Sequence, residues 1–570
     1  MNQLGRSSVK TPPEGLDKGL WFVPLGGSGE IGMNLNLYGC DGYWIVVDLG
    51  VTFGDESIPG VDVVMPDPDF IAERKNKLLA IVLTHAHEDH LGAVAYLWPK
   101  LGCPVYATPF TAEFLRNKLT ETGLRDLVPL VEVELGGRIE IGPFDIEYIS
   151  LTHSIPEPNG LAIRTPHGMV MHTGDWKFDP QPLIGAATDY NTLEALGDEG
   201  VLAMIGDSTN VFSEGESGSE SDVREVLVEV IGKQSGRVAV GCFASNLARL
   251  ASIAHAAEIN GRHVSLVGAS LWRIAATARK TGYLPDEINF YEAKDAAHLP
   301  RDKVLYICTG SQGESRAALN RIATHRHRDV ALEEGDTVLF SSRVIPGNEK
   351  SILRLQNQLA SLGVKIITAR DEPIHVSGHP ARGEMRRMYQ MIRPHTAIPV
   401  HGEHLHMRAH ASLAKECQVP QVLTVENGST VRLGPGEPVL AGEVWAGRMS
   451  WEGNHVVPFW NPILRDRKKI LFNGSVFVSL VLEEDGHLAE DAMVSVVGIP
   501  DPLVSGSSTI QAQESTETLE QVIENAIVRL PGRARRNNEA VEEVVRRCVR
   551  RIFSIEQDRK PLTRVHIVRI

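Results

Sequence analysis

The chain has 570 residues, of which 42% are hydrophobic and 23% are charged, and its formal net charge at pH 7 is -15. This composition is that of an ordinary folded protein with about three or four domains. The acidic balance argues against bulk electrostatic attraction to nucleic acid, but it leaves room for a local basic channel or for bound divalent cations. The 6 cysteines are scattered without a C-x-x-C pair. A disulfide framework or a thiolate zinc site is therefore not expected, and a reducing cytoplasm is the natural setting.

The N-terminal residues 1–18 are polar and predict a flexible arm without the apolar core of a signal peptide. No apolar run in the sequence approaches the length needed to cross a bilayer, so no membrane association is expected. From Leu20 the pattern favours strands. The glycine-rich residues 26–32 lack the Lys-Ser/Thr of a P-loop, and we interpret them as a tight turn near an active site.

The most informative segment is residues 84–90, which read Thr-His-Ala-His-Glu-Asp-His. The apolar run at residues 78–83 before it predicts a buried strand, and residues 91–97 after it predict the start of a helix. A strand-to-helix loop lets its side chains converge on one point. Neutral imidazole suits zinc, and a carboxylate adds charge and a hard oxygen ligand. The spacing H-x-H-x-D-H resembles the signature of the metallo-β-lactamase superfamily, and it makes metal ligands of His85, His87, Asp89 and His90.

One loop cannot complete a site for two metals, so further ligands must come from later in the chain. His153, Asp175 and His401 each closely follow an apolar strand, which predicts that they lie along one edge of a sheet. We expect one zinc ion to be held by His85, His87 and His153, and a second by Asp89, His90 and His401, with Asp175 bridging the pair. Two such cations turn a shared water into hydroxide near neutral pH and stabilise an in-line displacement. Manganese or magnesium is an alternative occupant, and Asp48 is expected to orient ligands from behind.

Residues 207–370 show their own alternation of predicted strands and helices. Strands are predicted near residues 238–242, 264–267, 304–308 and 338–341, with a helix over 246–260, as in a small doubly wound sheet. The pattern then returns to that of the first domain, which predicts a domain inserted into another. The predicted divisions are an arm at 1–18, a first domain formed by 19–206 and 371–435, an insert at 207–370, a linker at 436–467 and a C-terminal α/β domain at 468–570.

The long gap between Asp175 and His401 contains motifs that resemble the β-CASP nuclease branch of this superfamily, and specifically the bacterial ribonuclease J family. These motifs lie at residues 207–210, 243–246, 309–314, 345–349 and 375–379. The resemblance implies an α/β fold: a metallo-β-lactamase αββα sandwich, an inserted β-CASP domain and a small α/β C-terminal domain.

The resemblance also implies roles for single residues. Asp207 matches the acidic first β-CASP motif and joins Asp89 and His379 as a catalytic residue. Ser377 and His379 match residues that contact phosphate near the scissile bond, and His379 is a candidate proton donor to the leaving oxygen. The turn around them offers a hydroxyl, the open backbone N–H of Gly378 and an imidazole, which suits a phosphate, while His375 lines the same site.

The implied activity is that of a zinc-dependent ribonuclease acting in ribosomal RNA maturation and messenger RNA decay. Members of the family degrade single-stranded RNA from the 5′ end, prefer a 5′-monophosphate, also cut internally, and work in the cytoplasm as homodimers or homotetramers. This chain departs from the family at two positions. Ala248 stands where a histidine is frequent, and Glu157 stands where an aspartate is frequent.

Three alternatives remain open from sequence. One is a metallohydrolase of small lactones or thioesters, another is an inactive RNA-binding partner subunit, and the third is the same chemistry on DNA, since only contacts to the 2′-hydroxyl discriminate. His325 and His327 have the spacing of a metal-binding motif, but they lie in a charged stretch. Such a stretch favours a surface exposed to solvent. Arginines between residues 533 and 551 predict either an RNA contact, a solvated helix face or a subunit contact. The apolar stripe beginning at Val541 predicts core or a dimer interface.

Overall fold

The computed structural model describes residues 12–54, 58–500 and 518–570. The predicted N-terminal arm therefore lies mostly outside the described residues. The chain divides into two compact units. The first runs to Thr52 and from Met65 to Arg448, and the second contains residues 53–64 and 449–570. Within the described ranges, no helix is long and apolar enough to cross a membrane.

The first unit contains two sheets that pack face to face. One has the strand order β24-β23-β1-β3-β4-β7-β8-β9 and the other β10-β11-β12-β13-β14-β20-β22. The strands of the first sheet are β1 (Leu20–Gly26), β3 (Leu35–Cys40), β4 (Tyr43–Val47), β7 (Leu78–Val82), β8 (Val105–Ala107), β9 (Leu130–Glu132), β23 (Ser429–Gly434) and β24 (Val439–Glu443). Those of the second are β10 (Arg138–Ile141), β11 (Phe144–Ser150), β12 (Asn159–Thr165), β13 (Gly168–His172), β14 (Ala203–Asp207), β20 (Thr396–Val400) and β22 (Gln421–Val422).

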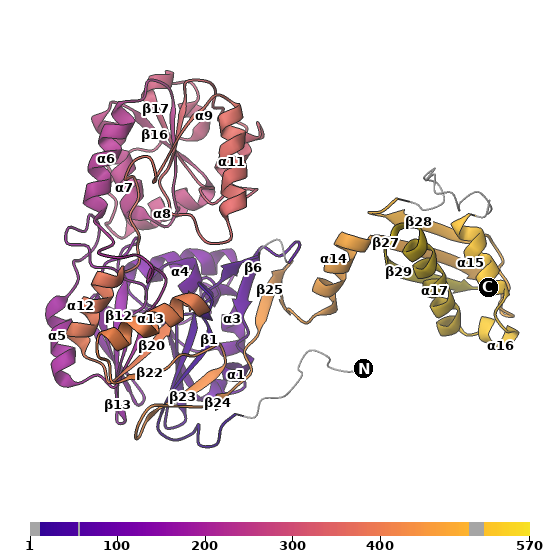
Figure 1. Cartoon of the computed structure of the whole chain (residues 1–570), viewed down its shortest axis with the longest axis horizontal. Coiled ribbons are helices and arrows are strands. Elements are labelled where there is room, and N and C mark those ends of the chain that lie inside the picture. Colours follow the sequence, from indigo (N-terminus) through magenta and orange to yellow (C-terminus); the bar gives the residue numbers. More distant parts are fainter. Residues whose placement is uncertain (1–11, 55–57, 501–517) are drawn as a thin grey trace. The chain divides into compact units, whose positions relative to one another are not determined.

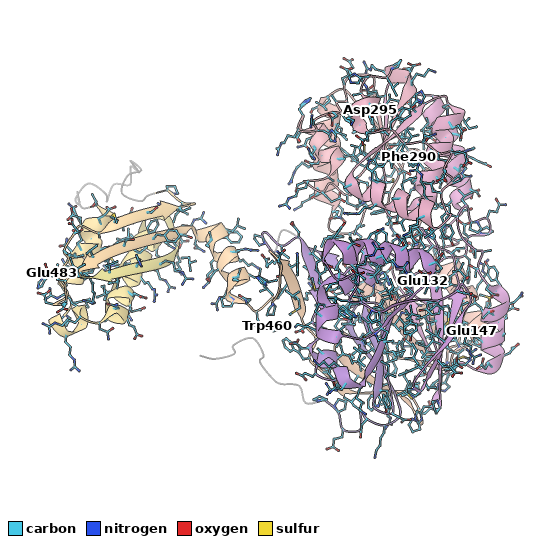
Figure 2. All side chains as sticks on the ribbon, turned by 180° about the vertical axis from the view of Figure 1, so that it is seen from behind. Glu132, Glu147, Phe290, Asp295, Trp460 and Glu483 are labelled. Atoms are coloured by element: carbon cyan, nitrogen blue, oxygen red, sulfur yellow. The ribbon has the colours of Figure 1, made fainter. Side chains whose placement is uncertain are left out.

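Side chains from both sheets form one core. Phe22 and Val82 from the first sheet belong to the same buried cluster as Ile146, Ile205 and Ile398 from the second. Each fully buried aliphatic or aromatic side chain contributes about 1.5–3 kcal/mol relative to exposure. Away from this core, Glu147 (labelled in Figure 2) pairs with Arg164 at 2.8 Å.

Helices cover the two outer faces, which completes the predicted αββα sandwich. The second sheet packs its other side against apolar residues of α5, α12 and α13, such as Leu196, Met388 and Leu413. The helices of the sandwich are α1 (Asp69–Ala72), α2 (Glu88–Leu91), α3 (Val94–Leu101), α4 (Pro109–Glu121), α5 (Tyr190–Glu199), α12 (Arg382–Ile392) and α13 (His404–Glu416). Short pieces are β2 (Ser28–Gly29), β5 (Thr52–Phe53), β6 (Val63–Pro66), β21 (Gly402–Glu403) and a 3₁₀ turn at Lys75–Lys77.

The insert leaves the sandwich after β14 and returns before β20, and these two strands pair in parallel. It is a parallel sheet with the order β16-β17-β15-β18-β19, with α6 and α7 on one side and α11 on the other (Figure 1). Its strands are β15 (Val238–Gly241), β16 (His263–Val267), β17 (Val304–Cys308), β18 (Thr337–Phe340) and β19 (Lys365–Thr368). Its helices are α6 (Glu220–Gly232), α7 (Leu247–Ile259), α8 (Ala269–Lys280), α9 (Ala293–Ala296), α10 (Ala318–Ala323) and α11 (Glu349–Ser361), with a 3₁₀ turn at Arg301–Lys303.

The strands and the helix predicted for the insert are confirmed to within one or two residues. The helix predicted over 246–260 is α7, and the side chain of Asn246 caps it by accepting a hydrogen bond from the backbone N–H of Arg249. The doubly wound arrangement follows from strands that are buried on both faces and read as continuous apolar runs.

The C-terminal part of the second unit is a sheet with the order β28-β27-β29 and helices packed against it. Val541, Val545 and Val549 lie in its core, so the apolar stripe serves packing within the unit. Residues 436–467, expected to be a linker, contain β24, β25, β26 and the start of α14. The elements from this point on are β25 (Arg448–Glu452), β26 (His455–Pro458), α14 (Pro462–Asn473), β27 (Ser475–Leu482), β28 (Met493–Val497), α15 (Leu519–Val528), α16 (Gly532–Arg535), α17 (Asn538–Gln557) and β29 (Leu562–Arg569).

Candidate metal centre

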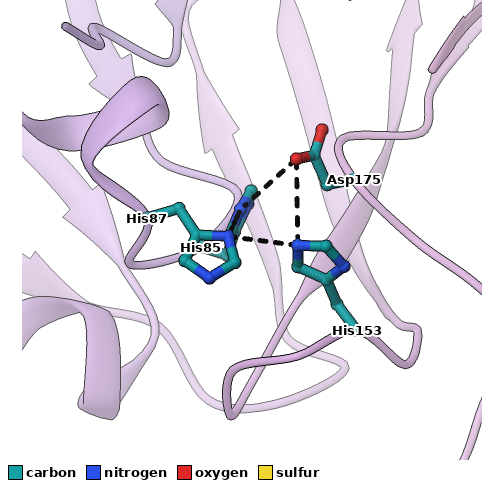
Figure 3. Close-up of side chains that lie close together, drawn as sticks. All are labelled: His85, His87, His153 and Asp175. Carbon is teal, nitrogen blue, oxygen red and sulfur yellow. Dashed lines mark hydrogen bonds and ion pairs between the residues drawn. The ribbon is translucent and has the colours of Figure 1, made fainter. Parts of the chain in front are cut away.

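Three histidine rings meet where β7 ends and α2 begins. Nε2 of His85 lies 3.0 Å from Nδ1 of His87, and Nε2 of His153 lies 3.1 Å from the same atom. Oδ2 of Asp175 approaches from the opposite side, at 3.9 Å from His85 and 3.8 Å from His153 (Figure 3). Histidines in a strand-to-helix loop and residues at two later strand ends therefore converge, as the sequence predicted.

A second group shares the carboxylate of Asp175. Its Oδ2 lies 3.2 Å from Nε2 of His90 and 3.5 Å from Nε2 of His401. Oδ2 of Asp89 lies 3.7 Å from His90 and 3.6 Å from His401. In each group the ligand atoms lie within 4.8 Å of one another. All seven predicted ligands are thus brought together, in the two predicted groups.

The donor set fits divalent cations. Among the described residues, the buried atoms Oδ1 of Asp175 and Nε2 of His401 have no hydrogen-bond partner. A buried carboxylate oxygen without a partner is costly, and a cation removes that cost. Burial and the neighbouring His90 and His87 lower the pKa of His85 well below its usual value. Burial and His87 do the same to the pKa of His153. Both rings are therefore neutral, as metal ligation requires.

The carboxylate of Asp48 orients the rings of His85 and His90 from the side away from the centre. Its Oδ2 accepts hydrogen bonds from Nδ1 of His90 at 2.7 Å and from the hydroxyl of Thr84 at 2.8 Å, and its Oδ1 accepts from the backbone N–H of Thr84. The Thr84 oxygen in turn accepts from Nδ1 of His85 at 2.9 Å. With both Nδ1 atoms engaged, His85 and His90 present Nε2 to the centre, which is the orientation that an outer carboxylate provides in metal sites. Asp48 thus occupies the orienting position that the sequence predicted.

Asn34 is a neighbour of the centre that sequence reasoning missed. Its side-chain nitrogen lies 3.1 Å from Nε2 of His90 and 2.9 Å from Nδ1 of His401, and it donates to the backbone carbonyl of Asp89 at 3.0 Å. In sequence, Asn34 only opens an apolar strand, and no signal marks it. The glycine turn does lie at the centre, because the carbonyl of Gly27 accepts a hydrogen bond from the backbone N–H of His401 at 2.6 Å.

Asp207 and His379 form a pair beside the metal ligands. Nδ1 of His379 donates to Oδ2 of Asp207 at 2.8 Å. Burial lowers the pKa of His379, but Asp207 and Asp175 outweigh it and raise that pKa to about 9. With Asp175 and His401 the pair makes a third group that offers ligand atoms to a cation. The backbone N–H of His379 donates to Oγ of Ser377 at 3.1 Å, which closes the turn between them.

His375 is held by a buried arginine of the insert. Nη1 of Arg249 donates to Nδ1 of His375 at 3.2 Å, so the proton of the neutral ring lies on Nε2. Burial and Arg249 keep the pKa of His375 well below its usual value. Arg249 pairs with Glu220 at 2.9 Å. Ala248, at the departure from the family pattern, is buried beside it and brings no polar group.

The remaining histidine motif is not part of any such group. His325 is exposed, and Nδ1 of His327 accepts a hydrogen bond from the backbone N–H of Val330 at 3.1 Å. Within the described ranges neither ring belongs to a candidate metal group. The predicted exposure is confirmed for His325, whereas His327 is half-buried.

Family models match four stretches of the chain. They are a "Beta-lactamase superfamily domain" at residues 44–193, a "Ribonuclease J, beta-CASP domain" at 235–359, a "Zn-dependent metallo-hydrolase RNA specificity domain" at 363–424 and a "Ribonuclease J C-terminal domain" at 462–570.

Full-length relatives match as well. The protein named Ribonuclease J from Sinorhizobium meliloti is 44% identical over 558 residues, which is 97% of this chain and 98% of that protein. The Ribonuclease J of Mycolicibacterium smegmatis is 38% identical over 84% of this chain and 86% of its own. That of Thermus thermophilus is 37% identical over 81% and 82%.

Proposed function

The chain belongs to the ribonuclease J family, and from that premise we propose that it is a metal-dependent hydrolase of single-stranded RNA. Its activities are 5′-to-3′ exonucleolytic degradation, with preference for a 5′-monophosphate, and internal cleavage, in RNA maturation and messenger RNA decay. The observation that carries the proposal is the convergence of six candidate ligands on Asp175 beside the pair formed by Asp207 and His379. An inactive partner subunit would be expected to have lost ligands, and this chain keeps all of them.

The proposed cofactor is a pair of zinc ions, because the donor set is rich in imidazole. His85, His87 and His153 would hold one ion, and Asp89, His90 and His401 the other, with Asp175 between them. When bound, such a pair supplies a water that ionises near neutral pH and positive charge opposite the phosphate. Manganese or magnesium is the alternative.

The chain's own residues then bind the substrate and move a proton. The hydroxyl of Ser377 and the backbone N–H of Gly378 belong to a turn that can hold a phosphate. His379, kept protonated by Asp207, stands where it can donate to the oxygen that leaves phosphorus. Asp207 accepts the Nδ1 hydrogen, so the proton that is transferred comes from Nε2. His375 offers its Nε2 hydrogen to the same substrate.

The domain roles belong to the same proposal. Residues 19–206 and 371–435 would hold the metals, 207–370 would form the other wall of an RNA channel, and 468–570 would serve assembly into a homodimer or homotetramer in the cytoplasm. DNA is not favoured, because the names of the matched relatives and family models refer to RNA.

The test uses the full-length protein on three labelled RNAs that differ only at the 5′ end, with monophosphate, triphosphate or hydroxyl. Each is incubated with added zinc or manganese and with chelator. Metal-dependent release of mononucleotides, fastest from the monophosphate, is the expected result. Absence of cleavage of every RNA by protein with a measured full metal content would overturn the proposal.

A further inference from the structure

Side-chain hydrogen bonds hold the loop that follows Asp207. The hydroxyl of Thr209 donates to the carbonyl of His401 at 3.1 Å, and Nδ2 of Asn210 donates to the carbonyl of His379 at 3.2 Å. The hydroxyl of Ser213 donates to Oδ1 of Asn210 at 2.6 Å. The loop is therefore hydrogen-bonded to the backbone of two residues of the candidate centre.

One side chain of this loop, that of Phe212, is exposed to solvent. Ser208 and Val211 are fully buried and Asn210 is 3% exposed, yet the ring of Phe212 is 57% exposed. A single exposed aromatic residue is common on protein surfaces and by itself needs no explanation. Phe212 differs because the neighbours that fix its position are the ones that contact His379 and His401.

A buried polar atom without a partner lies beside the ring. The rings of Phe212 and His406 are 4.9 Å apart between centroids. His406 is 8% exposed, and among the described residues its Nδ1 has no hydrogen-bond partner. A buried ring nitrogen without a partner costs free energy unless a ligand or a water satisfies it.

A cation without a carboxylate partner completes the group. The guanidinium of Arg343, an exposed residue of the insert, donates to Oδ1 of Asn210. A guanidinium has five N–H donors, and within the described part of the chain no acidic side chain forms a salt bridge with this one. Its free donors are suited to a phosphate, which a guanidinium binds through two parallel hydrogen bonds.

We propose that Phe212, His406 and Arg343 form a subsite for one nucleotide of the RNA strand beside the metal centre. The base stacks on the ring of Phe212, Nδ1 of His406 bonds to a polar edge of that nucleotide, and Arg343 holds its phosphate. Aromatic stacking accepts any base, because every base has a π-face, so the subsite binds the strand without selecting its sequence. The inference rests on the proposed function and adds to it a defined binding position for one nucleotide of the strand.

The test is an abasic scan of RNA binding by the full-length protein, in chelator so that no strand is cut. A set of 5′-monophosphorylated RNAs carries one abasic ribose at successive positions, and affinity is measured by fluorescence anisotropy. Wild-type protein should lose affinity at one position, by roughly 5- to 150-fold, as expected for one lost stack. In Phe212→Ala that position should no longer differ from its neighbours, and Phe212→Trp should restore the difference.

Two further variants separate stacking from charge and from general damage. Arg343→Gln should reduce the slope of log affinity against log salt by about 0.7, the value for one phosphate contact on a single strand. Phe472→Ala is the matched control, because Phe472 is 58% exposed on α14 of the other unit, and its scan should equal that of the wild type.

The failures are distinguishable. A flat scan in a wild-type protein that binds and cleaves RNA would overturn the subsite and leave the proposed function intact. A scan unchanged by Phe212→Ala would do the same, and if light scattering then showed an altered oligomeric state, the ring would belong to a contact between copies. A wild-type protein that neither binds nor cleaves RNA would overturn the proposed function itself.

Discussion

Nδ1 of His153 donates a hydrogen bond to the backbone carbonyl of Gly378, a residue 225 positions later in the chain. This bond joins a candidate metal ligand to the turn that carries His379. Because Nδ1 is engaged, Nε2 of His153 faces His87 and Asp175. The orientation of one candidate ligand and the position of the turn at residues 377–379 are therefore set by the same contact.

Gly378→Ala should disturb both at once. A Cβ at this position would lie 2.7 Å from Cε1 and 2.8 Å from Nδ1 of His153, closer than packed atoms allow. A displacement of about 1 Å in a catalytic arrangement costs roughly 100-fold in rate. We expect a loss of that size in kcat/KM together with weaker metal binding, measured by steady-state kinetics and by titration calorimetry. Gly532→Ala is the control, since the nearest atom to its Cβ is a flexible arginine tip at 3.9 Å. Equal effects of the two changes would contradict the argument.

Asp48→Asn should weaken metal binding without unfolding the protein. The carboxylate of Asp48 accepts from His90 and from Thr84, and an amide can accept only at its oxygen. Loss of an orienting group behind metal ligands costs about 10- to 100-fold in affinity. Metal content after dialysis against graded chelator measures it. Asp198→Asn, at an exposed surface pair with Arg393, is the matched change and should leave affinity unaltered.

His379→Ala should slow cleavage by roughly 100- to 10,000-fold, the usual range for a general acid, while metal content stays the same. The substrate can separate this role from mere positioning. A linkage with sulfur in place of the leaving 3′ oxygen needs no proton on departure. The variant should therefore recover most of the wild-type rate on that substrate. If the loss is equally large on both linkages, His379 is not the proton donor.

Glu157 predicts a pH dependence of stability. Burial raises the pKa of its carboxyl above the ordinary 4.5, although the backbone N–H of Phe110 and the hydroxyl of Tyr283 both donate to it. As pH falls, the folded state therefore takes up this proton before the unfolded state does. The contribution of Glu157 to the free energy of unfolding should rise as pH falls through the folded pKa toward 4.5.

The measurement is urea unfolding of the wild type and of Glu157→Gln at a series of pH values. The difference in free energy between them should shift in favour of the wild type at lower pH. All other titrating groups are common to both proteins and cancel. A difference that is constant with pH would show that the carboxyl is not perturbed.

Much of the site was predictable because its candidate ligands either share the short motif at residues 84–90 or directly follow apolar strands. His153, Asp175 and His401 each stand just beyond an apolar strand. The parallel pairing of β13 with β14, and of β14 with β20, places the strand ends before Asp175 and His401 at one edge of the sheet. Asn34 was not predictable, because its place between His90 and His401 depends on the path of the chain between β2 and β3. Asp48 was predicted as an orienting residue, but its positive φ of 62° and its link to His85 through Thr84 have no signature in the sequence.

The pairing of β14 with β20 has a consequence for synthesis. Asp207 stands opposite Val400, so the ribosome must make the whole insert before the strand that ends next to His401 can pair. At 5–20 residues per second, roughly ten seconds or more separate the emergence of Asp207 from that of His401. A nascent chain would therefore carry an incomplete candidate centre until most of it has left the ribosome.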